Sequence, residues 1–446
     1  MQYRESYNQK FERIAGQTLF GLLKEKQQNF IRRLAHRYRF TMQELRQVVE
    51  ACRDLDMWGE ESLENWWLSH FPEPEKDANL RQLKQARLQN LQAHLYTLRT
   101  MAKSYDQLHP SYPKYTGKKI VVKESDKNIF GWCPVASEKT VCCNLRTIDA
   151  VEGCAFGCSY CTIQTFYREE YVFDAHLKDK LQAIDLDAGR FYHIGTGQSS
   201  DSLIWGNRNG LLDDLVQFAR QRPNVLLELK TKSDNIDYFL DHDVPQNIFC
   251  SWSLNPQEII DREEYYTAGL EARLRAARAV ADKGMKVSFH FHPIIYYDHW
   301  HSAYPAIARR IMQEFDPQEI LFISFGSVTF IKPVIKKIRA TGISSKILQM
   351  NFVSDPHGKL TYADDIKIEK FTTMYQTFSP WHDRVFFYLC MEKASIWERS
   401  LGYVYTNNEE FERELIRHSV RKMDPLKKLL EAGIVSLPDE GIKERN

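Results

Sequence analysis

The stretch "VEGCAFGCSYCTIQ", residues 151–164, places three cysteines on one short segment with the spacing Cys-x3-Cys-x2-Cys. Cys154, Cys158 and Cys161 have no fourth cysteine in step with them. Four cysteines suit structural zinc or a fully ligated iron–sulfur cluster, whereas three leave one metal position open, as a catalytic [4Fe-4S] cluster that binds a substrate or cosubstrate requires. The alternatives are a buried set of reduced thiols or a zinc site completed by histidine, but no Cys-x2-Cys partner pair or His-x3-His lies nearby.

The composition is that of a large globular chain without a disulfide framework. The 446 residues exceed one compact core, so a barrel-sized domain with one or two smaller ones is expected. Nine cysteines are an odd number, which favours metal or redox chemistry over disulfides. A net charge of +1 creates no global field for nucleic acid or membrane. No apolar run of membrane-spanning length and no signal-type stretch occurs, so we expect a cytoplasmic protein with no membrane partner.

Strand-like and helical segments alternate from about residue 145 onward. Such alternation predicts parallel strands joined by right-handed crossovers, and six units would make a partial (β/α)6 TIM-like barrel. Chemistry in βα barrels lies at the carboxyl ends of the strands, and the cysteine segment follows the first strand. The predicted strands are 144–151, 191–197, 225–232, 248–255, 286–293 and 319–325. The predicted helices are 174–186, 210–221, 234–241, 269–283, 302–315 and 331–341.

The remainder of the chain divides around this barrel. We expect an α-helical domain at 1–112, the barrel at 113–345 with its cysteine loop at 153–162, and a carboxyl-terminal extension at 346–446. In the first part, Thr41-x-x-Glu44 resembles a capping box that opens a helix over 42–58. A long polar helix is expected at about 78–104, and the Pro- and Gly-containing stretch 109–118 reads as a linker.

Alternation within the predicted strands separates a polar face from an apolar face. Successive side chains on a strand point to opposite sides, so the apolar sets should pack on the outer helices and the polar sets should line the lumen. A lumen lined in this way favours a binding cavity, and its two histidines are candidate cavity residues. The polar sets are Glu228, Lys230 and Lys232; Ser251, Ser253 and Asn255; and Ser288, His290 and His292.

Several motifs together resemble one known family. The segments "CSYCTIQT", "GQSSD" (197–201), "LKTKSDNID" (229–237), "SWSLNPQEII" (251–260) and "HPIIYYDHW" (292–300) are similar to those of spore photoproduct lyases. These are radical S-adenosylmethionine enzymes that reverse a thymine dimer in DNA. The resemblance covers roughly residues 118–390, and the aromatic Tyr160 before the third cysteine is part of it.

The resemblance implies a set of cofactors and of residues that hold them. Cys154, Cys158 and Cys161 would hold three irons of a [4Fe-4S] cluster, and S-adenosylmethionine would chelate the fourth. One-electron reduction, by a donor such as flavodoxin or ferredoxin, would then yield a 5′-deoxyadenosyl radical that abstracts hydrogen from a substrate. By family position the residues near S-adenosylmethionine would be Ser200, Lys232 and Ser253, with Asp201 and Asn255 close by.

The chain departs from the family pattern at three places. Gln198 stands where the lyases have a hydrogen-donating cysteine, and glutamine has no weak S–H bond. Thr162 replaces the tyrosine expected after the third cluster cysteine. The family's DNA-contacting segment would fall at 351–362, where only His357 and Lys359 are basic, although phosphate contacts need Lys and Arg. We therefore expect a substrate other than the usual one: an altered nucleic-acid lesion, another nucleotide or a peptide.

The remaining cysteines and one basic stretch allow more than one interpretation. Cys133, Cys142 and Cys143 would either donate hydrogen to a radical, ligate a second cluster or pack, and Cys142 and Cys143 can hardly ligate one metal ion together without strain. Cys250 and Cys390 are expected to be buried. The basic stretch "RRLAHRYR", residues 32–39, is either a solvated helix face or a nucleic-acid contact.

Two classes of function follow from the sequence. The first is a radical S-adenosylmethionine enzyme, with Tyr160, Gln198, Cys142 and Cys143 as candidate catalytic residues. The second is a non-catalytic iron–sulfur protein that binds or senses redox state. Production of 5′-deoxyadenosine after anaerobic reconstitution and reduction would separate the two, because a binding module yields none.

Overall fold

The structure, a computed structural model, describes residues 6–74, 79–106, 108, 118–133, 139–162, 170–355 and 358–438. The chain forms two compact units, one of residues 1–113 with 330–353 and the other of residues 114–329 with 354–446. The division into three domains expected from the sequence stays a prediction. The expected linker at 109–118 lies outside the described residues except for Lys118. Within the described ranges, no helix combines the length and apolar character that crossing a membrane requires.

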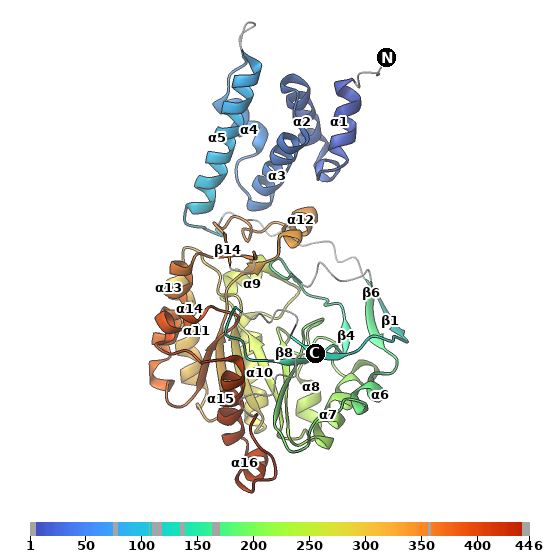
Figure 1. The fold of residues 1–446 in the computed structure, drawn as a ribbon, viewed down its shortest axis with the longest axis vertical. Coiled ribbons are helices and arrows are strands. Elements are labelled where there is room, and N and C mark those ends of the chain that lie inside the picture. The colour runs from blue at the N-terminus through green and yellow to red at the C-terminus, as the bar shows by residue number, and fades with distance from the viewer. Residues whose placement is uncertain are drawn as a thin grey trace. The chain divides into compact units, whose positions relative to one another are not determined.

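The first unit is helical, as expected from its sequence, and is drawn mostly in blue in Figure 1. The predicted capping box is confirmed: the backbone N–H of Glu44 donates to the Thr41 hydroxyl at 3.3 Å, and the N–H of Thr41 donates to the Glu44 carboxylate at 2.7 Å. Its elements are α1 (Tyr7–Ala15), η1 (Phe20–Leu22), α2 (Glu25–Tyr38), α3 (Met42–Trp58), α4 (Leu63–His70), α5 (Leu80–Thr100) and α12 (Lys332–Thr341).

A buried ion pair explains why residues 330–353 belong to this helical unit. Helix α12 packs on α3, and Arg339 pairs with Asp54 at 2.6 Å. Asp54 is 1% exposed, so its charge has lost its hydration. Further contacts must offset this cost in free energy. Arg99 supplies a second partner at 3.2 Å. The sequence pattern contains no sign of this long-range attachment.

The second unit contains a curled, mainly parallel sheet. Five of the six predicted barrel strands are confirmed and the first is confirmed in part, and the half-barrel they form is the expected fold class. They are β3 (Arg146–Ile148), β7 (Tyr192–Thr196), β8 (Val225–Thr231), β9 (Ile248–Ser253), β11 (Lys286–Phe291) and β12 (Ile320–Phe325). Two strands were not expected in this sheet: β16 (Phe386–Leu389) adds a parallel strand beside β12, and β2 (Phe130–Trp132) adds an antiparallel edge to β3. The order is β16-β12-β11-β9-β8-β7-β3-β2.

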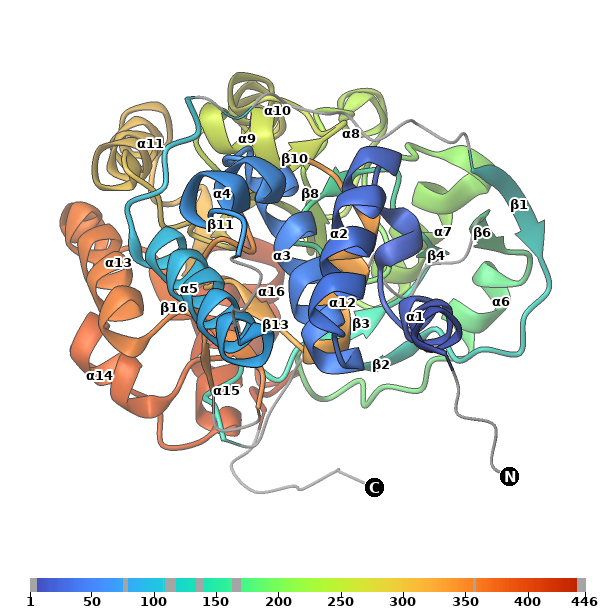
Figure 2. The same ribbon diagram turned by 90° about the horizontal axis from the view of Figure 1, so that it is seen from above.

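Helices cover the outer side of this sheet, as Figure 2 shows for α10, α11 and α13. Each crossover helix presents its apolar residues to the strands, which leaves the inner face of the curl for polar side chains. The helices are α6 (Leu177–Gln182), η3 (Arg208–Gly210), α7 (Leu211–Gln221), α8 (Asp237–Asp241), α9 (Gln257–Glu263), α10 (Leu270–Asp282), α11 (Trp300–Glu314), α13 (Asp364–Thr377), η4 (Ser379–Trp381), α14 (Ala394–Leu401), α15 (Asn408–Arg421) and α16 (Asp424–Glu431).

Short strands complete the architecture, and two pairings among them hold the cysteine loop. One small sheet has the order β1-β6-β4, and a two-stranded ladder joins β10 to β5. The predicted strand 144–151 is therefore wrong in its extent, because it divides into β3 in the barrel and β4 in the small sheet. The short strands are β1 (Lys119–Lys123), β4 (Val151–Glu152), β5 (Gly157–Cys158), β6 (Glu170–Asp174), β10 (Glu264–Tyr265), β13 (Thr329–Phe330), β14 (Val353–Ser354) and β15 (Leu360–Thr361).

The base of the lumen is packed around one carboxylate. Glu228 accepts hydrogen bonds from His193 at 2.9 Å, His290 at 2.7 Å and Ser251 at 2.6 Å. Burial alone would raise the pKa of Glu228, but Lys230 and the two histidines hold it well below its usual range. The predicted polar face is thus confirmed.

This network makes His290 a buried structural group and not a cavity residue. The rings of Phe249 and Phe322 fill the space beside the network. The half-buried polar side chains, Lys230, Lys232, Ser253 and His292, follow toward the carboxyl ends of the strands. The binding cavity expected from strand parity stays a prediction.

Candidate functional site

The cysteine loop begins with a glycine that its backbone conformation requires. Gly153 has a φ of +94°, and a Cβ there would lie 3.0 Å from the Tyr171 ring and 3.2 Å from the carbonyl oxygen of Glu170. Its N–H donates to the carbonyl of Ser199 at 3.0 Å, and its own carbonyl accepts from the Ser200 hydroxyl at 2.9 Å. The loop is therefore anchored at its start to the segment that follows β7.

The middle of the loop is held by a strand pairing far away in sequence. Cys158 lies opposite Glu264 in the antiparallel ladder of β5 and β10. The N–H of Ser159 donates to the carbonyl of Glu263 at 2.8 Å, and its hydroxyl donates to the Glu263 carboxylate. The hydroxyl of Tyr160 donates to the carboxylate of Glu264. The two adjacent glutamates thus fix the residues that separate Cys158 from Cys161.

Glu264 is the centre of a buried polar network behind the loop. Its carboxylate pairs with Arg273 at 2.5 Å and accepts from the Asn255 amide at 2.7 Å. Arg273 also donates to the carbonyl of Ser253 at 2.8 Å. Burial would raise the pKa of Glu264, but the charges of Arg273 and Lys232 hold it down at about 2. The site therefore keeps a fixed negative charge next to Tyr160.

The three cysteines lie within electrostatic reach of one another. The sulfur of Cys154 also accepts backbone N–H hydrogen bonds from Phe156 and Asp201. Hydrogen bonds of this kind stabilise thiolate ligands of iron–sulfur clusters. Among the described residues, no three His, Cys, Asp or Glu side chains are placed to hold a single metal ion. The donor set, three thiols on a clamped loop, fits a cluster with one open iron.

Ser200 and Asp201, predicted near the cosubstrate, fasten two loops together. The Ser200 hydroxyl donates to the carbonyl of Gly153 and accepts from the Trp205 indole N–H at 2.8 Å. The Asp201 carboxylate accepts from the backbone N–H of Lys232 at 2.7 Å and from the Thr231 hydroxyl at 2.9 Å. Two further backbone N–H groups complete its shell. Both side chains therefore position the cysteine loop and the end of β8, and direct contact with a cosubstrate stays a prediction.

Lys232 and Asn255 lie near Tyr160. The ammonium of Lys232 is 5.8 Å from the centre of the Tyr160 ring, and its side chain is half-buried. Asn255 is completely buried; its amide faces Glu264 and Tyr160, and its oxygen accepts from Tyr304 at 2.6 Å. Contact of Lys232 and the half-buried Ser253 with a cosubstrate stays a prediction.

The remaining predicted catalytic residues lie in two separate places. Gln198 is half-buried on the loop that follows β7, next to the segment that anchors Gly153. Cys142 and Cys143 lie near Cys390 and Lys230, and they precede the three-cysteine loop in the sequence. Of the four predicted catalytic residues, only Tyr160 has a side chain bonded into the network behind the loop.

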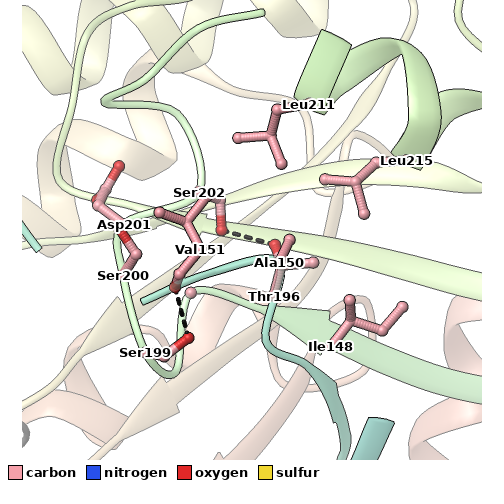
Figure 3. Close-up of a pocket in the computed structure, with 11 residues that line it drawn as sticks. Ile148, Ala150, Val151, Thr196, Ser199, Ser200, Asp201, Ser202, Leu211 and Leu215 are labelled. Carbon is pink, nitrogen blue, oxygen red and sulfur yellow. Dashed lines mark hydrogen bonds between the residues drawn. The ribbon is translucent and has the colours of Figure 1, made fainter. Parts of the chain in front are cut away.

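A small cavity beside the anchoring segment is shown in Figure 3. It lies between the β3–β4 connection, the loop after β7 and helix α7, where Leu211 and Leu215 close one side. The hydroxyl of Ser199 donates to the carbonyl of Val151 at 2.7 Å across it. The space of about 20 Å³ holds roughly one water molecule, so this cavity is too small for a nucleoside cosubstrate.

Sequence reasoning missed the groups that hold the loop. Glu263, Glu264 and Arg273 belong to α9, β10 and α10, and the local sequence pattern there looks like an ordinary solvated face. Both Glu264 and Arg273 are nevertheless at most 2% exposed. No apolar periodicity in the sequence indicates that these two residues form a buried ion pair. The pair is seen only in the structure.

Two stretches come into consideration as nucleic-acid contacts, residues 32–39 and residues 351–362. In the stretch 32–39, Arg32, Arg33 and Arg37 form ion pairs with glutamates. In the stretch 351–362, His357 lies outside the described residues, and Lys359 follows the turn at Asp355. The solvated-face interpretation of residues 32–39 therefore accounts for their contacts.

Comparisons with known proteins agree with this geometry. A spore photoproduct lyase family model matches residues 143–365. A spore photoproduct lyase of Geobacillus sp. (strain Y412MC61) is 26% identical over 199 residues, which are 43% of this chain and 58% of that protein. The lyase of Clostridium acetobutylicum is 23% identical over 230 residues, covering 48% of this chain and 67% of the relative. The chain thus spans less than two thirds of the Geobacillus relative.

Solved structures of spore photoproduct lyase share the fold. One that is complexed with dinucleoside spore photoproduct superposes with a TM-score of 0.51 at 20% identity, covering 60% of this chain and 81% of that one. A doubly substituted mutant with bound AdoMet and the same dinucleoside has a TM-score of 0.50 with the same coverage. The likeness covers the barrel and its cysteine loop, and the family model spans half of the sequence. The chain belongs to the spore photoproduct lyase family.

Proposed function

We propose that this chain is a radical S-adenosylmethionine enzyme of the spore photoproduct lyase type. Cys154, Cys158 and Cys161 would hold a [4Fe-4S] cluster and leave one iron for S-adenosylmethionine. The observation that carries this proposal is the three-thiol loop at the carboxyl ends of the parallel strands, clamped by the contact of Tyr160 with Glu264. A loop so restrained keeps its sulfurs in place while one metal position stays open.

The protein groups around the loop bind, orient and exclude water. When bound, the cluster and S-adenosylmethionine would supply a 5′-deoxyadenosyl radical for hydrogen abstraction. Lys232, at the end of β8, offers an ammonium to a carboxylate in the mouth of the lumen, because Asp201 fixes its backbone. The packed base formed by Glu228, Phe249 and Phe322 keeps water out from below. Reactive intermediates survive only in such a closed environment.

We assign the substrate to nucleotides or altered nucleic-acid lesions. The solved relatives hold a dinucleoside spore photoproduct, and the mouth here carries Lys230, Lys232 and His292, which suit an anionic ligand. Gln198 occupies the position expected for the hydrogen-donating cysteine and cannot replace it chemically. The product-forming hydrogen would therefore come from another group than in the lyases, with a one-electron donor of the flavodoxin or ferredoxin class as partner.

Anaerobic reconstitution followed by reduction with dithionite tests this proposal. We expect 5′-deoxyadenosine from S-adenosylmethionine with the unchanged chain and none with Cys158→Ala. Cys250→Ala is the matched control, because Cys250 is a fully buried thiol outside the loop. If the reconstituted, folded protein releases no 5′-deoxyadenosine, the rival holds: a protein that binds an iron–sulfur cluster for redox sensing. If the unchanged chain does release 5′-deoxyadenosine, candidate substrates that carry deuterium can be compared. The substrate is the one whose deuterium appears in 5′-deoxyadenosine.

A further inference from the structure

Seven of the nine cysteines fall into two groups at the barrel. The first is the three-cysteine loop. The second, called here the second cysteine group, consists of Cys133, Cys142, Cys143 and Cys390, and none of the four is in a disulfide. The remaining two, Cys52 and Cys250, are isolated buried residues. Four thiols brought together from three chain segments need a reason beyond packing, because each would serve the core equally well alone.

Backbone hydrogen bonds and one strand bridge bring these segments together. Cys133 follows β2 and donates its N–H to the carbonyl of Leu145 at 2.9 Å. Cys390 follows β16 and donates its N–H to the carbonyl of Phe325 at 2.8 Å. Val141 is bridged to Glu392, with its N–H 3.0 Å from that carbonyl oxygen. Cys142 and Cys143 thus continue from a segment that is tied to the residues just after Cys390.

The side chains are coupled as well as the backbone. Cys143 shares a side-chain hydrogen bond with Cys142 and lies within electrostatic reach of Cys390 and Lys230. Cys390 is in turn within reach of Cys133 and Cys142. The second cysteine group therefore lies around Lys230, which is two residues before Lys232 in the sequence.

Lys230 brings a positive charge to this place. Its ammonium is 3.6 Å from the Glu228 carboxylate, farther than a hydrogen bond, and it lies within electrostatic reach of Cys133, Cys143 and Cys390. Cys133, Cys143 and Cys390 are partly exposed residues. A nearby positive charge lowers the electrostatic cost of gathering negatively charged thiolate ligands.

We propose that the second cysteine group binds a second iron–sulfur cluster of the [4Fe-4S] type. Four thiols are the usual complement of ligands for such a cluster. A single zinc ion fits less well, because adjacent Cys142 and Cys143 would strain one ion and no described triad is placed to hold one. Ligation exchanges each S–H proton for an Fe–S bond, and the ammonium of Lys230 offsets the net negative charge of the thiolate-bound cluster. This inference goes beyond the proposed function and does not depend on cleavage of S-adenosylmethionine.

Iron content separates the two sites. After anaerobic reconstitution with iron and sulfide, we expect about eight irons per unchanged chain and about four in the triple variant Cys154→Ala/Cys158→Ala/Cys161→Ala. The reduced triple variant should keep an electron paramagnetic resonance signal that S-adenosylmethionine does not alter, since its irons have no open position. Adding Cys143→Ala and Cys390→Ala should remove this signal, whereas adding Cys250→Ala should not.

Circular dichroism checks that each variant is folded. If the combined variant does not fold, the single change Cys143→Ser replaces it in the experiment. That single change should lower the unchanged chain from about eight irons to about four. A folded triple variant without iron overturns the second cluster. The second cluster is also overturned if the unchanged chain binds only about four irons and Cys143→Ala stops only product formation. That result would make the second cysteine group a hydrogen donor. Four irons that survive the triple change without any 5′-deoxyadenosine from the unchanged chain would instead contradict only the proposed function.

Discussion

Tyr160 donates its hydroxyl hydrogen bond to Glu264, a residue 104 positions away in sequence. This contact ties the segment between Cys158 and Cys161 to a carboxylate that also pairs with Arg273. Because Arg273 and Lys232 hold its pKa at about 2, the carboxylate stays charged at neutral pH. The rigidity of the cysteine loop therefore rests on an ion pair outside the loop.

Replacing Glu264 should weaken both the fold and the loop. Glu264→Gln leaves the buried guanidinium of Arg273 without its counter-charge, which costs about 3–5 kcal/mol of unfolding free energy. Tyr160→Phe removes only one hydrogen bond and should cost about 1–2 kcal/mol. Urea unfolding of the metal-free chain measures both. Tyr96→Phe, on a tyrosine that is 60% exposed, is the control and should leave the midpoint unchanged. Equal losses for Glu264→Gln and Tyr96→Phe would show that the ion pair contributes nothing.

Gly153→Ala should displace the start of the loop. The left-handed backbone conformation and the 3.0 Å approach to the Tyr171 ring both oppose a Cβ at this position. We expect a loss of roughly 1–3 kcal/mol and poorer retention of reconstituted iron in the presence of a chelator. Gly131→Ala is matched to it, because a Cβ at Gly131 meets nothing within 4 Å. Unfolding midpoints and iron retention that are the same for both variants would contradict this account.

Asp201→Asn tests whether Asp201 positions Lys232. The amide nitrogen of Asn cannot accept the hydrogen bonds that the carboxylate now accepts, among them the bond from the backbone N–H of Lys232. If the proposed function holds, the dissociation constant for S-adenosylmethionine should rise about tenfold, equivalent to about 1.4 kcal/mol. Equilibrium binding to the reconstituted protein measures this value, with Asp282→Asn on an exposed helix face as control. A change in stability without a change in affinity would limit Asp201 to a structural role.

Stability should depend on pH through His418. Burial, together with Lys422 and Arg421, lowers the pKa of His418 from 6.5 to about 4. As the pH falls from about 6.5 to about 4, the unfolded chain takes up a proton that the folded chain refuses, so the native state loses up to about 1.4 kcal/mol per pH unit. His418→Gln should remove this part of the dependence when urea midpoints are compared across the range. The exposed His242→Gln serves as control, and a constant difference between unchanged chain and His418→Gln would be contrary to the prediction.

The three-cysteine loop could be predicted as a metal site because its three ligands are close together in the sequence. Spacing alone places Cys154, Cys158 and Cys161 on one loop, whatever the rest of the chain does. Strand parity is equally local, since side chains alternate with a period of two, and it correctly put Glu228 and Ser251 on one face. The order of strands and helices then sufficed to predict the half-barrel.

Only the tertiary structure decided what supports and surrounds that loop. The ion pair of Glu264 and Arg273 is connected to the cysteine loop because β10 pairs with β5. Cys390 lies near Cys142 and Cys143, and it follows β16, which joins the sheet beside β12. Sequence periodicity carries no information on contacts of this kind. They depend on distances between segments that are set by how the whole sheet curls, and the energy of a buried charge depends on which partners that curl supplies.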